Sequence, residues 1–89
     1  MSIEPVEARH NTITVTVFVP GETESRTFEF EKHSRVGEAA RVAATAFGFS
    51  GGDPTFAKGK DVLDRQKQLV AEGVRDGDAL ELIDTGGGV

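Results

Sequence analysis

The N-terminal part of the chain alternates apolar and polar residues with the period of a β-strand. Within Thr12–Val19, an isoleucine and three valines occupy one face, and threonines occupy most of the other. Arg26–Lys32 resumes the alternation, with Phe28 and Phe30 on one face. Pro20–Ser25, between the two segments, carries residues typical of turns. The pattern therefore predicts an N-terminal β-hairpin.

Helical spacing follows the hairpin. Ser34 is a residue type favoured at helix N-caps, and Gly48 is suited to the left-handed conformation that ends many helices. Between them, apolar residues recur on one helical face: Val36, Ala40, Ala43 and Phe47. The sequence predicts one main helix, capped by Ser34, whose alanine-rich face lies close to a sheet.

The remaining elements are short. Gly51–Pro54 is expected to form a loop and Arg75–Asp78 a tight turn. Around them the pattern predicts short strands at Thr55–Ala57 and Val62–Leu63, a single helical turn around Leu69–Val74, and a last strand at Ala79–Ile83. A chain of this size has no room for a layer on both faces of the sheet. The predicted fold class is therefore α+β, a mixed β-sheet with one main helix packed on one face and the first and last strands adjacent.

The two ends lack these periodic patterns. Residues 1–11 mix charged residues and proline without a period, which predicts a flexible leader. Residues 85–89 contain three consecutive glycines, which have no side chains to offset the entropy of ordering the backbone. We therefore expect a domain over 12–84 and a flexible glycine-rich tail over 85–89.

Composition narrows the classes of function. The 89 residues carry 15 acidic and 10 basic side chains, a net charge of −5 that opposes binding to nucleic acid. No apolar run has the length needed to cross a membrane, and the sequence contains no cysteine. The N-terminus does not resemble a signal peptide. A cytoplasmic protein without a membrane or nucleic-acid partner is the expectation.

Candidate catalytic chemistry is sparse. His10 and His33 are the only histidines, and they do not have metal-ligand spacing. The glycines near Lys60 lack the spacing of a phosphate-binding loop, and the acidic turn at Asp76–Asp78 lacks a calcium-loop pattern. We therefore expect no enzymatic activity, no metal and no cofactor in this chain.

Three segments resemble ubiquitin and its relatives, in the same order along residues 12–88. Phe56–Leu63 resembles the phenylalanine-alanine-glycine-lysine segment of ubiquitin with extra residues. Leu69–Val74 resembles its single-turn helix, and Arg75–Ile83 resembles its final turn and strand. The resemblance implies the ubiquitin-like β-grasp fold. The chain departs from ubiquitin at Thr55, which stands about where the central isoleucine of the recognition patch lies, and at Asp84-Thr85, which replaces an arginine-rich approach to the tail.

The short, acidic, cysteine-free chain is most similar to the ubiquitin-like modifiers of bacterial operons. That resemblance implies an activating enzyme, a conjugating enzyme, a JAMM-type metalloprotease and target proteins as partners. It assigns thioester formation and conjugation to the C-terminus at Gly86, Gly87 and Gly88, with processing between Gly88 and Val89. A side chain near the reacting carbonyl would obstruct a channel shaped for glycine. In this family a lysine also accepts the tail of another copy, and the possible chain acceptors are Lys32, Lys58, Lys60 and Lys67.

Other functions remain open at the level of sequence. A sulfur carrier would convert its terminal glycine to a thiocarboxylate, although Val89 after the glycines disfavours it. A ubiquitin-like binding module would act through its surface without conjugation. Phe18, opposite the valines of the first strand, is either part of an exposed contact patch or a cover for a sheet edge. The lysines are also ordinary surface charges, and the glycine tail taken alone is typical of a frayed terminus or an expression scar.

Overall fold

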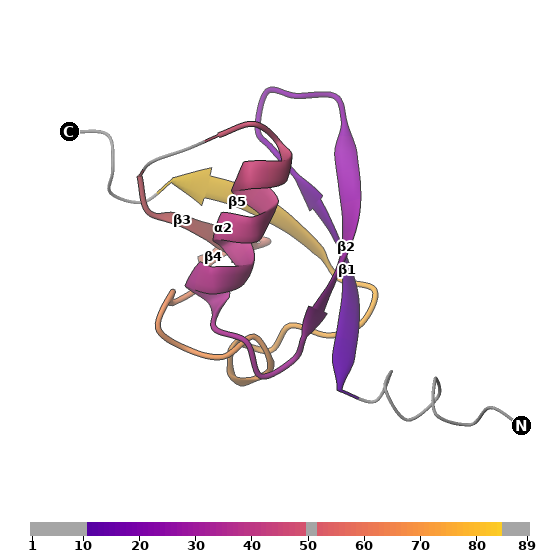
Figure 1. Ribbon diagram of the computed structural model, residues 1–89, viewed down its shortest axis with the longest axis vertical. Helices are drawn as coiled ribbons and strands as arrows, with labels where there is room; N and C mark the ends of the chain where they lie inside the picture. Colours follow the sequence, from indigo (N-terminus) through magenta and orange to yellow (C-terminus); the bar gives the residue numbers. More distant parts are fainter. Residues whose placement is uncertain (1–10, 50–51, 85–89) are drawn as a thin grey trace, which may run out of the picture.

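A five-stranded mixed sheet carries one α-helix on one face (Figure 1). The computed structural model describes residues 11–49 and 52–84. Its elements are β1 (Thr12–Phe18), β2 (Ser25–Glu31), α2 (Val36–Ala46), β3 (Pro54–Lys58), β4 (Asp61–Val62), the 3₁₀ turn η1 (Val70–Glu72) and β5 (Ala79–Asp84). The strand order is β2-β1-β5-β3-β4, with β1 and β5 parallel and the other pairs antiparallel. This confirms the predicted α+β class and the adjacency of the first and last strands.

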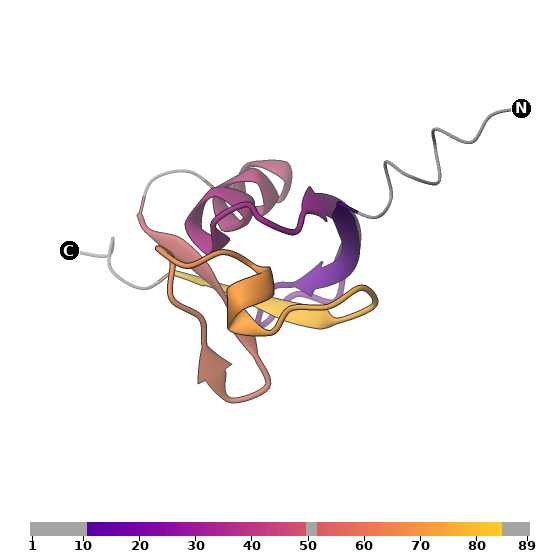
Figure 2. The same ribbon diagram turned by 90° about the horizontal axis from the view of Figure 1, so that it is seen from below.

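The predicted alternation of the hairpin sets its register. Ile13 lies opposite Phe30 and Val15 opposite Phe28, so the apolar residues of β1 and β2 share the face that α2 covers. The parallel partner of Val17 is Leu80, and neither side chain is accessible to solvent. Figure 2 shows α2 on one side of the sheet, above β5. The core therefore forms between this face of the sheet and the alanine-rich face of the helix, where Ala39, Ala40, Ala43 and Ala44 are buried.

Phenylalanine rings join elements that are distant in sequence. The rings of Phe28 and Phe30 stack with centroids 5.6 Å apart, and Phe30 lies 6.1 Å from Phe56 of β3. Phe47, directly after α2, lies 6.3 Å from Phe28. These separations fall in the range in which aromatic pairs attract beyond simple burial. The rings thus tie the outer strand β2 to both the helix end and β3.

The prediction of Ser34 as the helix N-cap is wrong. The N-cap is Arg35, and it makes no side-chain capping hydrogen bond. The backbone of the 64–68 segment takes over this role, since Val36 N–H donates to Lys67 O at 2.8 Å and Gly37 N–H donates to Arg65 O at 3.0 Å. Carbonyl groups of a distant segment therefore accept the hydrogen bonds from the first N–H groups of the helix, which a capping side chain normally accepts.

Most of the short elements appear where the pattern predicts them. Gly48 has a φ of 90° and ends α2 as expected, and Gly77 with a φ of 92° sits in the predicted turn before β5. The helical turn around Leu69–Val74 is a 3₁₀ turn of three residues. Leu63 lies just outside β4, although its side chain is buried. Leu63 therefore belongs to the core, although it follows the last residue of the strand.

Leu82→Ala tests the assignment of the covered face. Leu82 is 5% exposed in the core beneath α2, so truncation should lower the free energy of unfolding by about 2–5 kcal/mol. Val42→Ala is the control, because Val42 is 56% exposed on the helix surface and its loss should change stability by no more than about 0.5 kcal/mol. Chemical denaturation of both variants measures this. Equal effects at the two positions would contradict the assignment.

Candidate functional site

The end of β5 positions the segment that carries the predicted C-terminal chemistry. β5 lies inside the sheet, paired with β1 on one side and β3 on the other, and it ends at Asp84. The predicted reactive residues Gly86, Gly87 and Gly88 and the processing position Val89 lie outside the described residues. The structure therefore defines where the tail begins, at the end of a strand whose last three residues pair with β3.

A carboxylate fixes this exit point. Oδ1 of Asp84 accepts a hydrogen bond from Asp53 N–H at 3.0 Å, and Asp84 also lies opposite Pro54 in the β3–β5 pair. Gly52 has a φ of +70°, and a Cβ at this position would collide with the Asp84 carboxylate. Only glycine combines that backbone conformation with the required space. The loop before β3 thus holds the last described residue of β5 in place.

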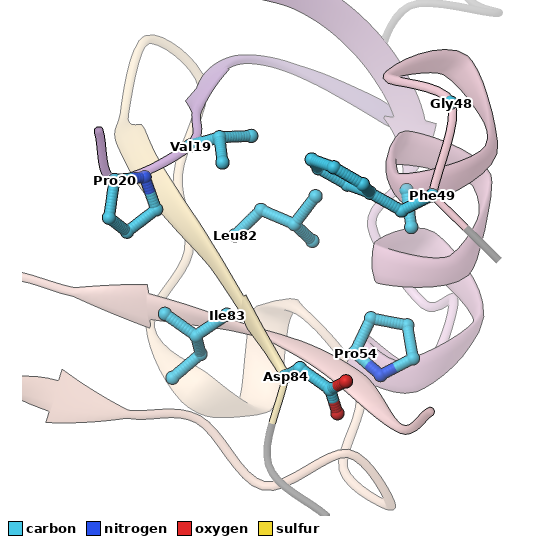
Figure 3. Close-up of a pocket in the computed structure, with 9 residues that line it drawn as sticks. Val19, Pro20, Gly48, Phe49, Pro54, Leu82, Ile83 and Asp84 are labelled. Carbon is cyan, nitrogen blue, oxygen red and sulfur yellow. The ribbon is translucent and has the colours of Figure 1, made fainter. Parts of the chain in front are cut away.

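An apolar groove of about 530 Å³ borders the exit (Figure 3). Figure 3 shows Val19 and Pro20 on one side and Phe49 and Pro54 on the other, with Leu82 between them. Phe49 is 46% exposed, so a large aromatic surface remains available here. The full lining is Val19, Pro20, Ala44, Gly48, Phe49, Pro54, Leu82, Ile83 and Asp84. The base of the tail therefore adjoins an apolar recess between the helix end and the sheet.

Sequence reasoning missed both the carboxylate anchor and the groove. In the sequence, Asp84 stands out only as a departure from ubiquitin, and Gly52 only as part of a glycine-rich loop. The only sequence signal for this contact is a glycine-rich loop shortly before a strand. Such a loop does not indicate which distant residue it contacts. The groove gathers residues from both strands of the β3–β5 pair, the first turn and the helix end.

A second surface lies on the sheet face opposite α2, which we call the open sheet face; the chain after β4 covers part of it at β3. Strand register places Phe18, Glu81, Ala57 and Val62 in one row across β1, β5, β3 and β4. Phe18 is 38% exposed and Val62 is 58% exposed, whereas Ala57 is buried. β1 lies between β2 and β5, so Phe18 does not cover a sheet edge. Of the two interpretations of Phe18, its position favours an exposed apolar contact on the open face.

Thr55 does not belong to that contact surface. Its side chain is fully buried, and its hydroxyl donates a hydrogen bond to the carbonyl of Leu63 at 2.9 Å. The bond holds the chain after β4 against β3 and satisfies a buried polar group. The burial of Thr55 fits the departure from ubiquitin at this position, because a buried side chain cannot make the partner contact of a recognition-patch isoleucine.

The four predicted acceptor lysines differ in their surroundings. The ammonium of Lys58 forms an ion pair with Asp78 at 2.9 Å and donates to the carbonyl of Gly73 at 2.8 Å. Lys60 and Lys67 are exposed, and Lys32 is half-buried. No side-chain partner of these three lysines is found within residues 11–49 and 52–84. Lys58 is therefore held in place, and Lys60 and Lys67 present the most accessible amines.

Asp78 joins this ion pair to the turn before β5. Partial burial opposes ionisation of its carboxyl, but hydrogen bonds from Arg75 N–H at 2.8 Å and from Lys58 outweigh that effect. Together with the positive charges of both side chains, they lower the pKa of Asp78 below its ordinary value of 3.8. The ionised carboxylate of Asp78 thus helps to hold the turn that precedes β5.

The other candidate residues have ordinary structural surroundings. His33 is exposed, and its ring Nδ1 lies 3.1 Å from Oε1 of Gln68. His10 lies outside the described residues. Within the part of the chain that the structure describes, no three histidine or acidic side chains gather as metal ligands, and no helix is long and apolar enough to span a membrane.

Comparison with solved structures identifies the fold. Ubiquitin of Caldiarchaeum subterraneum superposes with a TM-score of 0.71 at 17% identity, covering 88% of this chain and 99% of that one. The UBL domain of Plasmodium falciparum Dsk2 gives a TM-score of 0.70 at 20% identity, covering 83% and 99%. The ubiquitin-like domain of the Mycobacterium tuberculosis type VII secretion protein EccD1 gives 0.62 at 20% identity, covering 82% and 98%. No protein-family model and no curated protein sequence matches the chain significantly.

The arrangement is therefore the ubiquitin-like β-grasp fold. Its structural neighbours include both a ubiquitin and ubiquitin-like domains of other proteins. At these identities the likeness concerns the fold, and function depends on the sites that the fold carries.

Amine labelling tests the different surroundings of the lysines. Under limiting acetylating reagent, Lys58 should react more slowly than Lys60, because its ammonium already donates to Asp78 and Gly73. Asp78→Asn should speed the labelling of Lys58 and leave that of Lys60 unchanged. Mass spectrometry of peptides at successive times gives the rates. If Lys58 reacts as fast as Lys60 in the unaltered protein, the ion pair does not restrain it in solution.

The pH dependence of stability tests the ionised state of Asp78. Because folding lowers the pKa of this carboxyl, its stabilising contribution is present above the pKa in the unfolded chain and is lost as the pH falls through the lower folded value. Asp78→Asn should therefore reduce the free energy of unfolding at neutral pH, and the deficit should shrink as the pH falls below about 4. Urea denaturation at a series of pH values measures both proteins.

Asp61→Asn is the matched control for this series. The Asp61 carboxylate is exposed and makes no hydrogen bond or ion pair with the described residues. Its variant should follow the unaltered protein at every pH. A deficit for Asp78→Asn that stays constant down to strongly acidic pH would contradict the proposed role of its charge.

Proposed function

We propose that this chain is a protein modifier that is joined through its C-terminal glycine to amines on target proteins. The observation that carries the proposal is the exit of the glycine-rich segment from β5 of a ubiquitin-like domain, at an Asp84 held by the loop before β3. A fixed exit would start the tail from a reproducible point on the domain. In this proposal, residues 1–11 are a leader, 12–84 the folded domain and 85–89 the reactive tail.

The chemistry would proceed in four transfers on partner enzymes. The Gly88 carboxylate attacks the α-phosphorus of ATP on an activating enzyme, which forms the acyl adenylate and releases pyrophosphate. A cysteine thiolate then displaces AMP to give a thioester. After transfer to a conjugating enzyme, a target amine attacks the thioester carbonyl, so that an amide forms and the thiol leaves. This chain supplies the acyl group and needs no catalytic residue of its own.

Processing would precede these steps. Val89 places a β-branched side chain beside the terminal carboxylate, which is unsuited to a channel shaped for glycine. A JAMM-type metalloprotease would hydrolyse the Gly88–Val89 bond with a metal-activated water, and the zinc would belong to that partner. The apolar groove beside Asp84 offers an enzyme a contact close to the tail, because Phe49 there is 46% exposed. A cytoplasmic setting among bacterial conjugation enzymes suits this chemistry.

The open sheet face favours a second function, a ubiquitin-like binding module that is never conjugated. Phe18 and Val62 present apolar surface on that face, and the comparisons include the UBL domain of Dsk2. Another similar structure comes from a complex of ATBAG1 with HSP70, of which the present chain spans 40%. A sulfur carrier, which shares the adenylation step, remains the third alternative.

Thioester formation with the cognate activating enzyme tests the proposed function. The full-length chain, a form ending at Gly88, and a Gly88→Val variant of that shorter form are each offered with ATP. The form ending at Gly88 should form a thioester readily, whereas the other two should be poor substrates because of the side chain near the reacting carbonyl. Non-reducing gel electrophoresis and intact mass measure the product.

The outcomes separate the three functions. If the full-length chain is charged as readily without losing Val89, the processing step is wrong. If Gly88→Val is charged normally, the glycine is not the reactive element. Mass spectrometry of the cellular protein then distinguishes a lysine-linked remnant, expected for the modifier, from replacement of one oxygen by sulfur, expected for a carrier. Absence of both products together with retained partner binding after removal of Gly87 and Gly88 would favour the binding module.

A further inference from the structure

Three of the six arginines in the sequence gather at one groove, far along the chain from the glycine tail. The groove measures about 370 Å³ and lies between the N-terminal half of α2 and the 65–66 segment. Arg35, Arg41 and Arg65 line it, together with Glu38 and Val42. We call this surface the arginine groove. Its concentration of positive charge contrasts with the net charge of −5 of the whole chain.

Backbone contacts hold two of these side chains at the groove. Nε of Arg65 donates to the carbonyl of Pro54 at 2.7 Å, and Nη2 of Arg41 donates to the carbonyl of Gly52 at 3.2 Å. Gly37 makes room for Arg65, because a Cβ at position 37 would lie 3.0 Å from the guanidinium carbon. Each of these contacts occupies only part of a guanidinium group, which carries five N–H donors.

The three arginines have no carboxylate partner in the described chain. Within residues 11–49 and 52–84, the one ion pair joins Lys58 to Asp78, and Glu38 does not pair with an arginine although it lines the same groove. Three neighbouring positive charges repel one another, and a bound anion would relieve that repulsion. The remaining N–H groups are suited to paired hydrogen bonds with carboxylate oxygens.

The surroundings favour an acidic peptide over a nucleic acid or a phospholipid surface. Glu38 and the net negative charge would repel a polymer or a membrane with closely spaced phosphates. Val42, 56% exposed at the same groove, offers an aliphatic contact. A peptide can place separated carboxylates on the arginines, place an apolar side chain on Val42 and keep away from Glu38.

We propose that the arginine groove binds a segment of a partner protein in which acidic residues alternate with aliphatic ones. The inference concerns the helix face and does not depend on conjugation through the tail. It would give the protein a recognition surface separate from both the open sheet face and the groove at Asp84.

A synthetic probe peptide tests the proposal on the full chain. The probe is fluorescein-labelled and contains glutamates separated by leucine and serine, and a second probe has glutamine at every glutamate position. Fluorescence anisotropy should show binding of the glutamate probe, weakened by salt, and much weaker binding of the glutamine probe. Amide chemical shifts should change at Gly37, Val42 and Gln66, which line the groove.

Matched charge variants locate the binding. Arg35→Gln with Arg41→Gln should weaken binding of the glutamate probe by about tenfold or more, because charge-assisted hydrogen bonds are lost. Lys60→Gln with Arg75→Gln removes the same charge from exposed positions elsewhere and should change affinity by less than about twofold. Circular dichroism and thermal melting check that both double variants remain folded.

Several results would overturn the proposal. One is equal weakening by the two double variants, since that would mean attraction to overall charge. Another is the absence of binding or of shifts around Gly37 and Val42 at low salt. Tighter, arginine-dependent binding of single-stranded DNA or of vesicles containing phosphatidylserine would assign the groove to phosphate ligands and would also reject an acidic peptide as its occupant.

Discussion

The parallel pairing of β1 with β5 joins segments separated by about sixty residues, and the other parts of the fold rest on it. Thr16, Val17 and Phe18 pair with Ala79, Leu80 and Glu81. Outside the regular pairing, Gly77 N–H donates to Thr14 O at 2.7 Å, and Thr14 N–H donates to a carboxylate oxygen of Asp76 at 2.7 Å. Closing so long a loop is entropically costly, although that cost grows slowly with length. Burial of Val17 and Leu80 at this pairing offsets the cost.

This pairing also determines where each candidate surface lies. With β5 inside the sheet, its end at Asp84 meets the loop before β3 and the C-terminal end of α2. The same arrangement leaves the open sheet face without a helix, and Phe18 and Val62 are exposed there. The arginine groove lies at the opposite end of α2, because the chain after β4 returns to the start of the helix and supplies backbone carbonyls to Val36 and Gly37.

Glycine serves three separate purposes in this small domain. At Gly52 it permits both a positive φ and the approach of the Asp84 carboxylate, whereas at Gly37 it leaves space for the Arg65 side chain. Gly37 also gives up the helix propensity that alanine would supply. Packing of the Arg65 side chain against Gly37 therefore offsets this loss of helix propensity. Neither residue lies in the proposed reactive tail.

The sequence by itself determined the elements, the covered faces and the fold class. Alternation in 12–19 and 26–32, helical spacing from Val36 to Phe47 and the turn at 75–78 are local patterns, and local side-chain geometry suffices to interpret them. The sequence also singled out the glycine tail and the lysines as candidate chemistry, and their roles in conjugation stay predictions.

Only the tertiary structure decided which distant groups meet. The carbonyls of Arg65 and Lys67, and not Ser34, cap the helix, and Thr55 is buried beneath the chain after β4. The tertiary structure also paired Lys58 with Asp78, anchored Asp84 to Asp53 and gathered three arginines at one groove. The residues that meet in this way are at least twenty positions apart in the sequence, except Thr55 with Leu63 and Arg35 with Arg41; Arg65 comes from the segment after β4. Their distances depend on how strands and loops pack, which no local periodicity specifies.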